Sequence, residues 1–395
     1  MPFMRICIFL CCLSVFGAEL RRLDGSRIRV DEAEAFARKT LSEAKVTGAQ
    51  IAMVDRGKLV WSFAYGERSV SPSMPMTVET TTWAASITKG FFGVYLMQLV
   101  ERGVIALDIP IAKQLPRPLE TYESYRETAA ELVLDPAWLT ITPRMMANHS
   151  SGLKNFPFLE PDKKMHLHFK PGSQYSYSGE GLNIVQLLIE QKLGKPLSEL
   201  MQEAFFDRLG MKRTGLIYRK EFEANVADRF NEKGGFIAKT KRFPARAAGS
   251  MTSSAEDVAH FAEALLGDQL LKSATKKEMF RPTLAIRTLH QFPLAANEPD
   301  GEEAKAIGLA YGVGWGLLTT TKFGPAFFKE GHGDGAQNFM ICFERRKACM
   351  VILTNSDNGE LAFRPLLEKI LGNAVTPWEW HAFTPGAIAA GRANQ

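Results

Sequence analysis

The order of apolar patterns along the 395-residue chain constrains its fold most, because β-type runs lie near both ends and helical patterns fill the middle. Residues 48–69 alternate in polarity on either side of Asp55-Arg56-Gly57, which is typical of a β-hairpin. Further β-rich runs near the C-terminus are residues 325–331, 336–344 and 348–356. We expect the two ends to build one sheet, with the middle of the chain inserted as a mainly helical part.

Helical periodicity appears in several segments, most of which end at a glycine. These segments are residues 31–45, 87–103, 181–194, 253–267 and 361–372. The patterns together predict an α/β chain of the α+β type with an antiparallel sheet flanked by helices. We expect residues ~19–82 and ~240–395 to form the α/β lobe and residues ~83–239 the mainly helical lobe.

Composition and charge exclude some classes of protein. The chain is 46% hydrophobic and 23% charged, which is ordinary for a globular protein and argues against disorder. Its 48 basic and 43 acidic residues leave a formal charge of only +5, without a dense basic run interleaved with aromatic residues. We therefore expect no nucleic-acid partner.

The N-terminal residues differ in kind from the rest of the chain. Arg5 precedes an apolar run, and the small residues Gly17 and Ala18 follow it. This is the order of a secretory signal peptide, which we place at residues 1–18. The pattern predicts a secreted or periplasmic protein, and retention of this segment as a membrane anchor is the alternative.

Three of the five cysteines lie within the predicted signal peptide, which leaves Cys342 and Cys349. If the turn between the two strands centres on Arg345-Arg346, these cysteines face each other across a hairpin. A disulfide and a pair of buried free thiols are both possible, and we favour free thiols because cross-strand bridges are often strained.

Ser86 and Lys89 are the first candidates for chemistry. Residues at i and i+3 share one face of a helix, and Ser86 opens a strongly apolar helix after a β-rich stretch. The helix dipole disfavours an ammonium at a helix N-terminus, so Lys89 can lose its proton more easily there. A neutral amine beside a hydroxyl places a base beside a nucleophile. The same spacing occurs without this context at Ser42–Lys45, Ser151–Lys154 and Ser273–Lys276.

Two further stretches carry residues that suit a catalytic site. Tyr177 lies in a Gly- and Ser-rich turn before a helix, and a phenol near a cationic lysine can exchange a proton. An isolated tyrosine in this place is otherwise a core residue. His332 lies in a glycine-rich strand, where the backbone can approach a ligand closely and offer N–H groups to an acyl oxygen.

These motifs, in this order, resemble those of the class C β-lactamase and penicillin-binding-protein-like serine hydrolases. That family includes carboxylesterases, D-amino peptidases and D-Ala-D-Ala carboxypeptidases. The resemblance covers nearly the whole mature chain. It rests on WAASITKGFFGVYLMQLVERGVIALD (residues 83–108), TPRMMANHSSGL (142–153), PGSQYSYSGEGLNIVQLLIE (171–190), AAGSMTSSAEDVAHFAEALL (247–266), YGVGWG (311–316) and GHGDGAQNF (331–339).

The resemblance implies a β-lactamase/transpeptidase-like fold and a role for each matched residue. Ser86 would be the nucleophile, Lys89 its activating partner and Tyr177 the general base and acid. His332 stands where the family has Lys, His or Trp, and the second oxyanion N–H would come from Gly335 or a neighbour. No metal or organic cofactor is implied.

Two positions depart from the family pattern. The second motif usually reads Tyr-x-Asn, and here Gly179 replaces the Asn and offers no side-chain hydrogen bond. The third usually reads Lys-Thr-Gly or His-x-Gly, and here it is read as His332-Gly333-Asp334, with glycine only at Gly335. A histidine is a poorer carboxylate anchor than lysine, and Asp334 adds negative charge, so both changes favour a neutral substrate.

The functional prediction is a carboxylesterase-like serine hydrolase that forms an acyl-enzyme on Ser86 and acts on a small-molecule ester or amide. The alternatives are a D-Ala-D-Ala carboxypeptidase or weak β-lactamase, acyl transfer to an acceptor other than water, and a non-catalytic binding protein of the same fold. We expect His149 to be a buried supporting residue and the pair His166 and His168 to bind no metal. The natural substrate and the oligomeric state stay open.

Overall fold

The computed structural model describes residues 18–292, 300–372, 375–384 and 386–388. A single antiparallel sheet dominates it, in the strand order β10-β11-β12-β13-β14-β15-β3-β4-β5. From one edge to the other these strands are β10 (Leu284–Ala285), β11 (Leu309–Tyr311), β12 (Gly316–Leu318), β13 (Ala326–Gly333), β14 (Ala336–Phe343), β15 (Ala348–Thr354), β3 (Gly48–Asp55), β4 (Lys58–Val70) and β5 (Ser73–Pro75). Because β15 pairs with β3, both ends of the chain build this sheet, as the sequence predicts.

Three two-stranded sheets complete the strands. They pair β1 (Glu19–Arg21) with β2 (Arg27–Arg29), β6 (Thr82–Trp83) with β9 (Thr252–Ser253), and β7 (Asp228–Phe230) with β8 (Phe236–Lys239). The helices are α1 (Val30–Glu43), α2 (Ile87–Glu101), α3 (Ile111–Gln114), α4 (Pro143–Ala147), α5 (Gly179–Leu193), α6 (Leu197–Met201), α7 (Ala255–Leu266), α8 (Ser273–Met279), α9 (Glu302–Ala306) and α10 (Glu360–Leu366). Short 3₁₀ and π turns are η1 (Leu119–Thr121), η2 (Glu123–Tyr125), η3 (Leu132–Leu134), η4 (Pro136–Thr140), η5 (Pro157–Leu159), η6 (Gln202–Phe206), η7 (Lys220–Asn225) and η8 (Leu367–Leu371).

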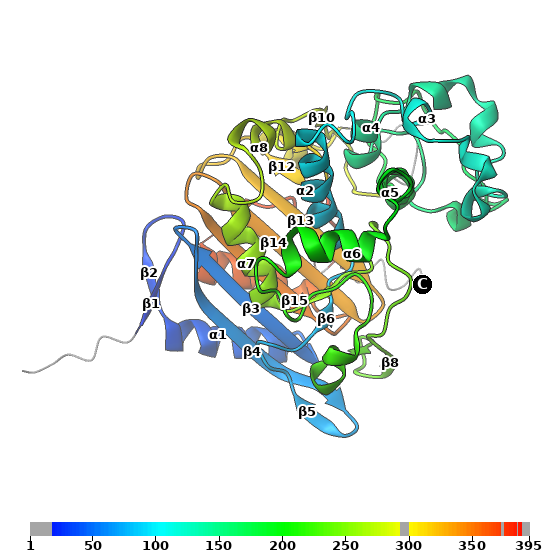
Figure 1. Cartoon of the computed structure of the whole chain (residues 1–395). Coiled ribbons are helices and arrows are strands. Elements are labelled where there is room, and N and C mark those ends of the chain that lie inside the picture. Colours follow the sequence, from blue (N-terminus) through cyan, green and yellow to red (C-terminus); the bar gives the residue numbers. More distant parts are fainter. Residues whose placement is uncertain (1–17, 293–299, 373–374, 385, 389–395) are drawn as a thin grey trace, which may run out of the picture.

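Helices cover both faces of the sheet (Figure 1). One face packs against α1, α10 and η8, and the other packs against α2 and α7. Side chains alternate between the two cores along a strand: Val351 and Leu353 of β15 join the α2 and α7 side, while Met350 and Ile352 join the other. A sheet buried on both faces explains why the central strands are apolar at almost every position.

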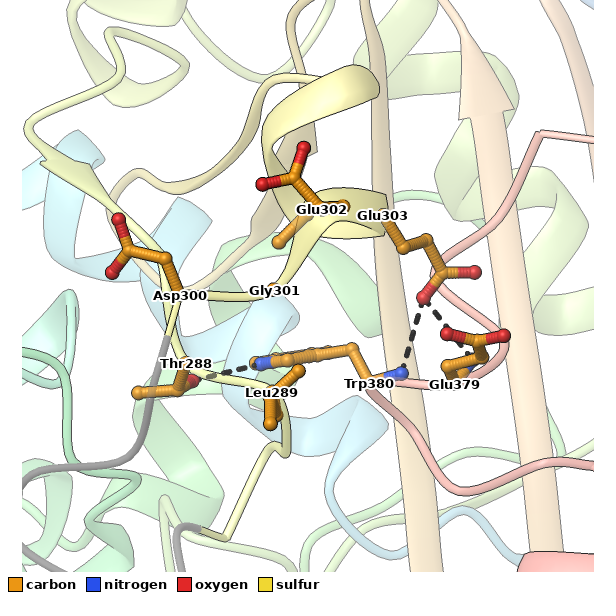
Figure 2. A pocket seen from close by; sticks show the side chains of 9 residues that line it. Thr288, Leu289, Asp300, Gly301, Glu302, Glu303, Glu379 and Trp380 are labelled. Atoms are coloured by element: carbon orange, nitrogen blue, oxygen red, sulfur yellow. Dashed lines mark hydrogen bonds between the residues drawn. The ribbon is translucent and has the colours of Figure 1, made fainter.

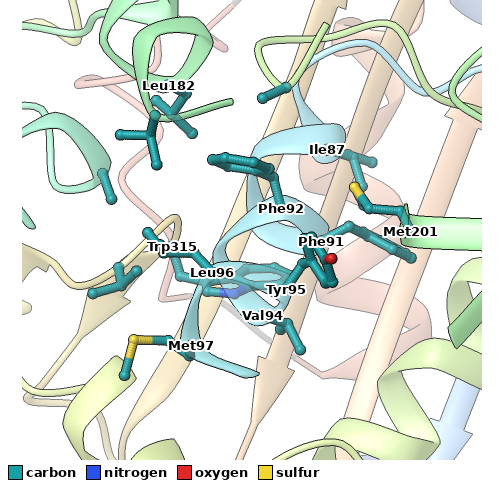
Figure 3. Packing of buried hydrophobic residues seen from close by; sticks show 14 of the residues in the cluster. Ile87, Phe91, Phe92, Val94, Tyr95, Leu96, Met97, Leu182, Met201 and Trp315 are labelled. Carbon is teal, nitrogen blue, oxygen red and sulfur yellow. The ribbon is translucent and has the colours of Figure 1, made fainter. Parts of the chain in front are cut away.

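Helix α2 is apolar on all sides because it is surrounded by protein (Figure 3). Phe91 stacks on Phe261 of α7 with ring centroids 3.6 Å apart. On another face of α2, a Cβ at Gly93 would lie 2.6 Å from the carbonyl oxygen of Val313, so the helix and the loop before β12 approach backbone to backbone. This close packing fixes the direction of the helix that begins at Ser86.

The middle of the chain is mostly helical. Elements α3, α4 and the short 3₁₀ turns between them extend beside the end of α2, and α5 lies between this group and the sheet (Figure 1). The lobe boundaries near residues 82 and 240 stay a prediction.

The two remaining cysteines form a disulfide. Cys342 of β14 and Cys349 of β15 are direct cross-strand partners, with Cα atoms 4.1 Å apart. The sequence-based preference for two free thiols is therefore wrong, because the hairpin register places both side chains on the same face of the sheet, within bonding distance.

The proposed signal peptide lies outside the described residues except for Ala18. Within the part of the chain that the structure describes, none of the helices combines the length and apolarity needed to cross a membrane.

Candidate active site

Ser86 stands at the junction of a short strand and α2. Strand β6 is held by β9, and the backbone then turns through Ala85, which has a positive φ of 47°. Such a conformation is unfavourable for a residue with a Cβ and is kept only where the surroundings enforce it. Thr88 contributes by donating a 2.5 Å hydrogen bond to the Ala85 carbonyl while accepting one from Met251 N–H. The turn presents a half-exposed Ser86 at the helix start.

Lys89 lies one helical turn further on and is 1% exposed. Its Nζ is 2.8 Å from Ser86 Oγ and also donates to the carbonyl oxygen of Ala248. Two side chains of α5 hold the loop that contains Ala248, because Gln186 accepts a hydrogen bond from Ala247 N–H and Asn183 accepts one from Ala248 N–H. The sequence-predicted Ser–Lys pair is thus in hydrogen-bond contact.

The surroundings of Lys89 favour its neutral form. Burial lowers the pKa of Lys89 well below its ordinary value, the charge on Lys329 lowers it further, and Glu330 opposes the shift. A neutral amine is the form that can accept a proton from Ser86.

Tyr177 lies in the turn before α5 and approaches the Ser86–Lys89 pair from there. Ser178 caps that helix by accepting a hydrogen bond from Gly181 N–H. The Tyr177 ring lies 4.9 Å from Lys89 Nζ and stacks on His149, with ring centroids 4.3 Å apart. The structure therefore brings together Ser86, Lys89 and Tyr177.

Tyr177 keeps its proton at neutral pH. Burial raises its pKa well above the ordinary value and the charge of Glu330 adds to this, while a hydrogen bond with Ser86 opposes it. His149 is fully buried and accepts from Ser178 N–H at Nδ1, over 3.1 Å. Burial, Lys329 and Lys89 lower the pKa of His149, so it supports the Tyr177 loop as a neutral ring.

Sequence analysis missed a buried ion pair in this site. Lys329 and Glu330 of β13 are 0% and 1% exposed, and the Lys329 ammonium contacts the Glu330 carboxylate. Lys329 Nζ also donates to Tyr177 Oη over 3.1 Å. The signal was present in the sequence, since two adjacent charges interrupt an otherwise apolar strand run, and Lys329-Glu330-Gly331 differs from Lys-Thr-Gly at one position.

The ion pair is held by a polar chain that extends away from Ser86. Gln291 Nε2 donates to Glu330 Oε1 over 2.6 Å, and His381 Nδ1 lies 3.3 Å from Gln291 Oε1. Burial raises the pKa of Glu330, but the charge and hydrogen bond of Lys329, together with His381 and His332, lower it by more, so Glu330 is ionised. Burial lowers the pKa of His381 to about 3, which leaves this ring neutral.

The side chain of His332 does not approach Tyr177. Its Nδ1 lies 2.6 Å from Glu360 Oε1 and its ring lies against Phe383, on the α10 side of the sheet. Lys329, three residues earlier, occupies the place next to Tyr177 that sequence analysis gave to His332. Side chains alternate along a strand, so Lys329 and Gly331 share the face toward α2 while His332 points the other way.

The two other predicted substrate-binding positions are also occupied by protein groups. The Gly335 N–H donates to Asp357 Oδ1 over 2.6 Å, so it is not directed at Ser86. The Gly179 N–H donates to Asn155 Oδ1 over 2.8 Å. A Cβ at Gly179 would lie 2.8 Å from the Phe156 ring, so an aromatic side chain fills the space that the family's asparagine would take.

The backbone of β13 can supply the second oxyanion donor. Strand β12 pairs with β13 only as far as Phe328, so β13 has a free edge beyond that residue. A two-residue turn joins Gly333 to Ala336, and residues that flank such a turn exchange backbone hydrogen bonds with each other. Backbone N–H groups alternate in direction along a strand, so the N–H of the preceding residue, His332, points away from β14 to the free edge. Gly331 packs against the Ala84 carbonyl and Ile87 N–H, so this edge lies beside Ser86. The N–H groups of Ser86 and His332 suit a tetrahedral oxyanion.

Three aromatic side chains form a rim beside Tyr177 and Gly179. Phe292 is 52% exposed and meets the Tyr177 ring edge-on, with centroids 5.3 Å apart. Phe158 is 66% exposed and stacks on Phe156, which covers Gly179. This rim is apolar and contributes no charge.

A separate pocket is lined by residues 288–289, 300–304 and 379–380 (Figure 2). Glu303 accepts hydrogen bonds from the backbone N–H groups of Glu379 and Trp380, and the Trp380 indole donates to Thr288 over 3.1 Å. The Trp380 carbonyl in turn accepts from Gln291 N–H over 2.8 Å. These contacts hold the loop that contains Gln291 in the position where Gln291 donates to Glu330.

Metal-type clusters of three or more His, Cys, Asp or Glu side chains do not occur among the described residues. His166 lies 2.8 Å from Asp162, and His168 contacts Glu160 at 2.5 Å.

Comparisons with known proteins identify the family of the chain. The β-lactamase family model matches residues 33–371. Similar proteins are a lovastatin esterase of Penicillium rubens (28% identical, 48% of this chain, 54% of that protein), a D-aminopeptidase of Brucella anthropi (28%, 49% and 37%) and esterase EstB of Burkholderia gladioli (26%, 49% and 55%). The matches thus span about half or less of these relatives.

Solved structures share the fold. The octameric penicillin-binding protein homologue of Pyrococcus abyssi superposes with a TM-score of 0.70 at 21% identity, covering 92% of this chain and 81% of that one. The D-amino acid amidase of Ochrobactrum anthropi SV3 superposes with a TM-score of 0.65 at 21% identity, covering 91% and 98%. The fold class predicted from the sequence is confirmed, and the chain belongs to the β-lactamase family.

Proposed function

We propose that this protein is a serine hydrolase that forms an acyl-enzyme on Ser86 and cleaves small-molecule esters with a neutral, apolar leaving group. The observation that supports it most is the 2.8 Å contact between Ser86 Oγ and the buried Lys89 Nζ, whose pKa is lowered by burial. The esterases among the similar proteins support the same class of reaction.

In the proposed mechanism Lys89 takes the proton of Ser86 as Oγ bonds to the ester carbonyl carbon. The backbone N–H groups of Ser86 and His332 stabilise the oxyanion, each donor contributing about 2.7–4 kcal/mol. Tyr177 donates its proton to the leaving oxygen as the C–O bond breaks, and Lys89 returns a proton to Tyr177. Water then attacks the acyl-enzyme, giving one proton back through Lys89 to Ser86, which releases the acid.

The Lys329–Glu330 pair supports a neutral leaving group. A lysine next to Tyr177 would attract a carboxylate on the leaving group, but Glu330 already neutralises it inside the protein. A substrate carboxylate there would meet no net positive charge and a nearby negative one. The aromatic rim of Phe156, Phe158 and Phe292 suits an apolar alcohol instead.

The same pair argues against a D-Ala-D-Ala carboxypeptidase or β-lactamase, since their substrates carry a carboxylate on the leaving side. The compact Ser86, Lys89 and Tyr177 set argues against a non-catalytic binding protein, because a binding site does not need a buried lysine of lowered pKa beside a hydroxyl.

The test is hydrolysis of 4-nitrophenyl butyrate by the mature protein and by Ser86→Ala. We expect turnover that is lost in Ser86→Ala, with unchanged thermal unfolding of the variant. Equal turnover in both proteins would exclude Ser86 as the nucleophile, and no turnover in either would refute the esterase proposal.

We also propose that the protein is exported, with residues 1–18 removed. The Cys342–Cys349 disulfide supports this, because such bonds persist in oxidising compartments. N-terminal sequencing of the protein from its native cells should begin after residue 18, and an intact leader would instead favour a membrane anchor.

A further inference from the structure

Two arginines share one tryptophan next to the nucleophile. The guanidinium carbon of Arg242 lies 3.8 Å from the Trp83 ring centroid, and that of Arg229 lies 5.0 Å from it. We propose that Arg229 and Arg242 bind a carboxylate at the far end of the substrate's acyl chain, so that the preferred substrate is a monoester of a short dicarboxylic acid. This inference rests on the proposed esterase function and names its acyl group.

Neither arginine of this cluster forms an ion pair with a described residue. Within the described residues, Arg242 has no ion pair or side-chain hydrogen bond. Arg229 donates from Nη1 to the backbone carbonyl of Asp334 over 2.6 Å, while its buried Nε has no described partner. The Asp334 carboxylate favours the charged form of both arginines, and the Asp357 carboxylate favours that of Arg229, in each case without an ion pair to the arginine.

The cluster is held firmly in place. Arg229 belongs to β7, whose Phe230 exchanges backbone hydrogen bonds with Asn355 and Asp357 at the end of β15. The Trp83 indole donates to the Gly249 carbonyl over 2.6 Å. Two half-buried guanidinium groups thus contact one fixed aromatic ring, and the charge of Arg229 disfavours the charged form of Arg242. An anion that bridges them would relieve that repulsion.

The position relative to Ser86 follows from strand β13. Gly331 packs against Ala84, next to Ser86, and Gly333 packs against the Trp83 ring. Two residues of extended strand span about 6.6 Å, so the cluster lies roughly that far along β13 from the reacting carbon.

The direction identifies the acyl side. Tyr177, the proposed proton donor to the leaving group, contacts Lys329 at the start of the free edge. The acyl chain leaves the carbonyl carbon on the opposite side, toward Gly333 and Trp83. The same site therefore combines a neutral leaving-group side with two arginines on the acyl side. Arg229 donates to the backbone carbonyl of Asp334, the residue that the sequence predicted to repel anions.

The experiment compares two esters with the same leaving group and the same chain length, 4-nitrophenyl hydrogen glutarate and 4-nitrophenyl valerate. We expect the full mature chain to prefer the glutarate by at least about tenfold in kcat/KM. Arg242→Gln should lose about tenfold on the glutarate and less than twofold on the valerate, chiefly through KM, while Arg242→Lys should keep part of the preference. Added salt should weaken the preference.

The control variant is Arg27→Gln, which removes one exposed charge from the small β1–β2 sheet and should leave both rates unchanged. Thermal unfolding of each variant separates a lost contact from a lost fold. Turnover of the valerate without any preference for the glutarate, or equal losses on both esters in Arg242→Gln, would overturn the anion subsite alone. No turnover of either ester would overturn the proposed function and this inference with it.

Discussion

At the residue scale, the charge state of Lys89 depends on two neighbours of opposite sign. Lys329 lowers the pKa of Lys89 and Glu330 raises it, in addition to the dominant lowering by burial. Because the neutral amine is the base in the proposed mechanism, kcat/KM should rise as pH increases through the Lys89 pKa and then level off.

The first prediction concerns this acid limb of the pH profile. Lys329→Met removes a positive neighbour, so the pKa of Lys89 should rise and the limb should move to higher pH. Glu330→Gln removes a negative neighbour, so the limb should move to lower pH. Steady-state rates with a 4-nitrophenyl ester from pH 4 to 9 measure both shifts. If the acid limb stays at the same pH in both variants, a group other than Lys89 causes it.

A second prediction follows from the net charge next to Tyr177. Glu330→Gln leaves the Lys329 charge unpaired, so it can attract the carboxylate of a penicillin. Acylation by a penicillin should therefore gain at least about tenfold relative to hydrolysis of a neutral ester, which corresponds to about 1.4 kcal/mol of added attraction. Glu330→Thr provides a second variant, since removing one partner of a buried pair costs about 3–5 kcal/mol of stability. An unchanged ratio in a folded variant would show that Glu330 does not control this preference.

At the element scale, α2 depends on glycine where it meets the loop before β12. Alanine normally stabilises a helix by about 1 kcal/mol relative to glycine. At Gly93 the added Cβ would lie 2.6 Å from the Val313 carbonyl oxygen, which is backbone and cannot rotate away.

We therefore predict that Gly93→Ala destabilises the protein by about 1–3 kcal/mol, and that activity falls with it because Ser86 begins this helix. Urea unfolding measures the change in free energy. The exposed Ala35→Gly in α1 should show the ordinary propensity cost of up to about 1 kcal/mol. Stabilisation by Gly93→Ala would contradict the close packing described for α2.

Sequence patterns predicted these elements well and the third motif poorly. The apolar periodicity placed α2, α5 and α7 within two residues of their observed ends, since burial on a helical face repeats every 3.6 residues. Ser86, Lys89 and Tyr177 come together as expected. The sequence predicted that His332 of β13 lies near Tyr177, but Lys329 does. Only the folded strand shows which residues face α2 and which face α10. Arg229 and Arg242 were not found at all, since they lie far from Trp83 in sequence.

At the scale of the whole molecule, the central sheet joins distant parts of the chain, and the Cys342–Cys349 disulfide crosslinks two of its inner strands. The bond closes a short loop, for which the chain-entropy model gives a stabilisation of about 2.5 kcal/mol. We predict that the double variant Cys342→Ala/Cys349→Ala unfolds at a lower temperature than the oxidised protein. Reduction should lower the midpoint of the wild type and leave the variant unchanged, whereas full alkylation of both cysteines in the denatured, unreduced protein would contradict the bond.

The candidate active site also depends on the whole molecule, because its groups come from α2, the turn before α5, β13 and the loop that contains Gln291. No single segment contains all of these groups, and the proposed mechanism requires that they converge on the Ser86 hydroxyl.

The most direct measurement is mass spectrometry of the protein after brief reaction with a fluorophosphonate, followed by peptide mapping. We expect one adduct, on the peptide that contains Ser86, which is absent in Ser86→Ala and much slower to form in Lys89→Arg, because arginine stays protonated. An adduct of equal yield in Ser86→Ala, or one mapped to another serine, would contradict the proposed mechanism.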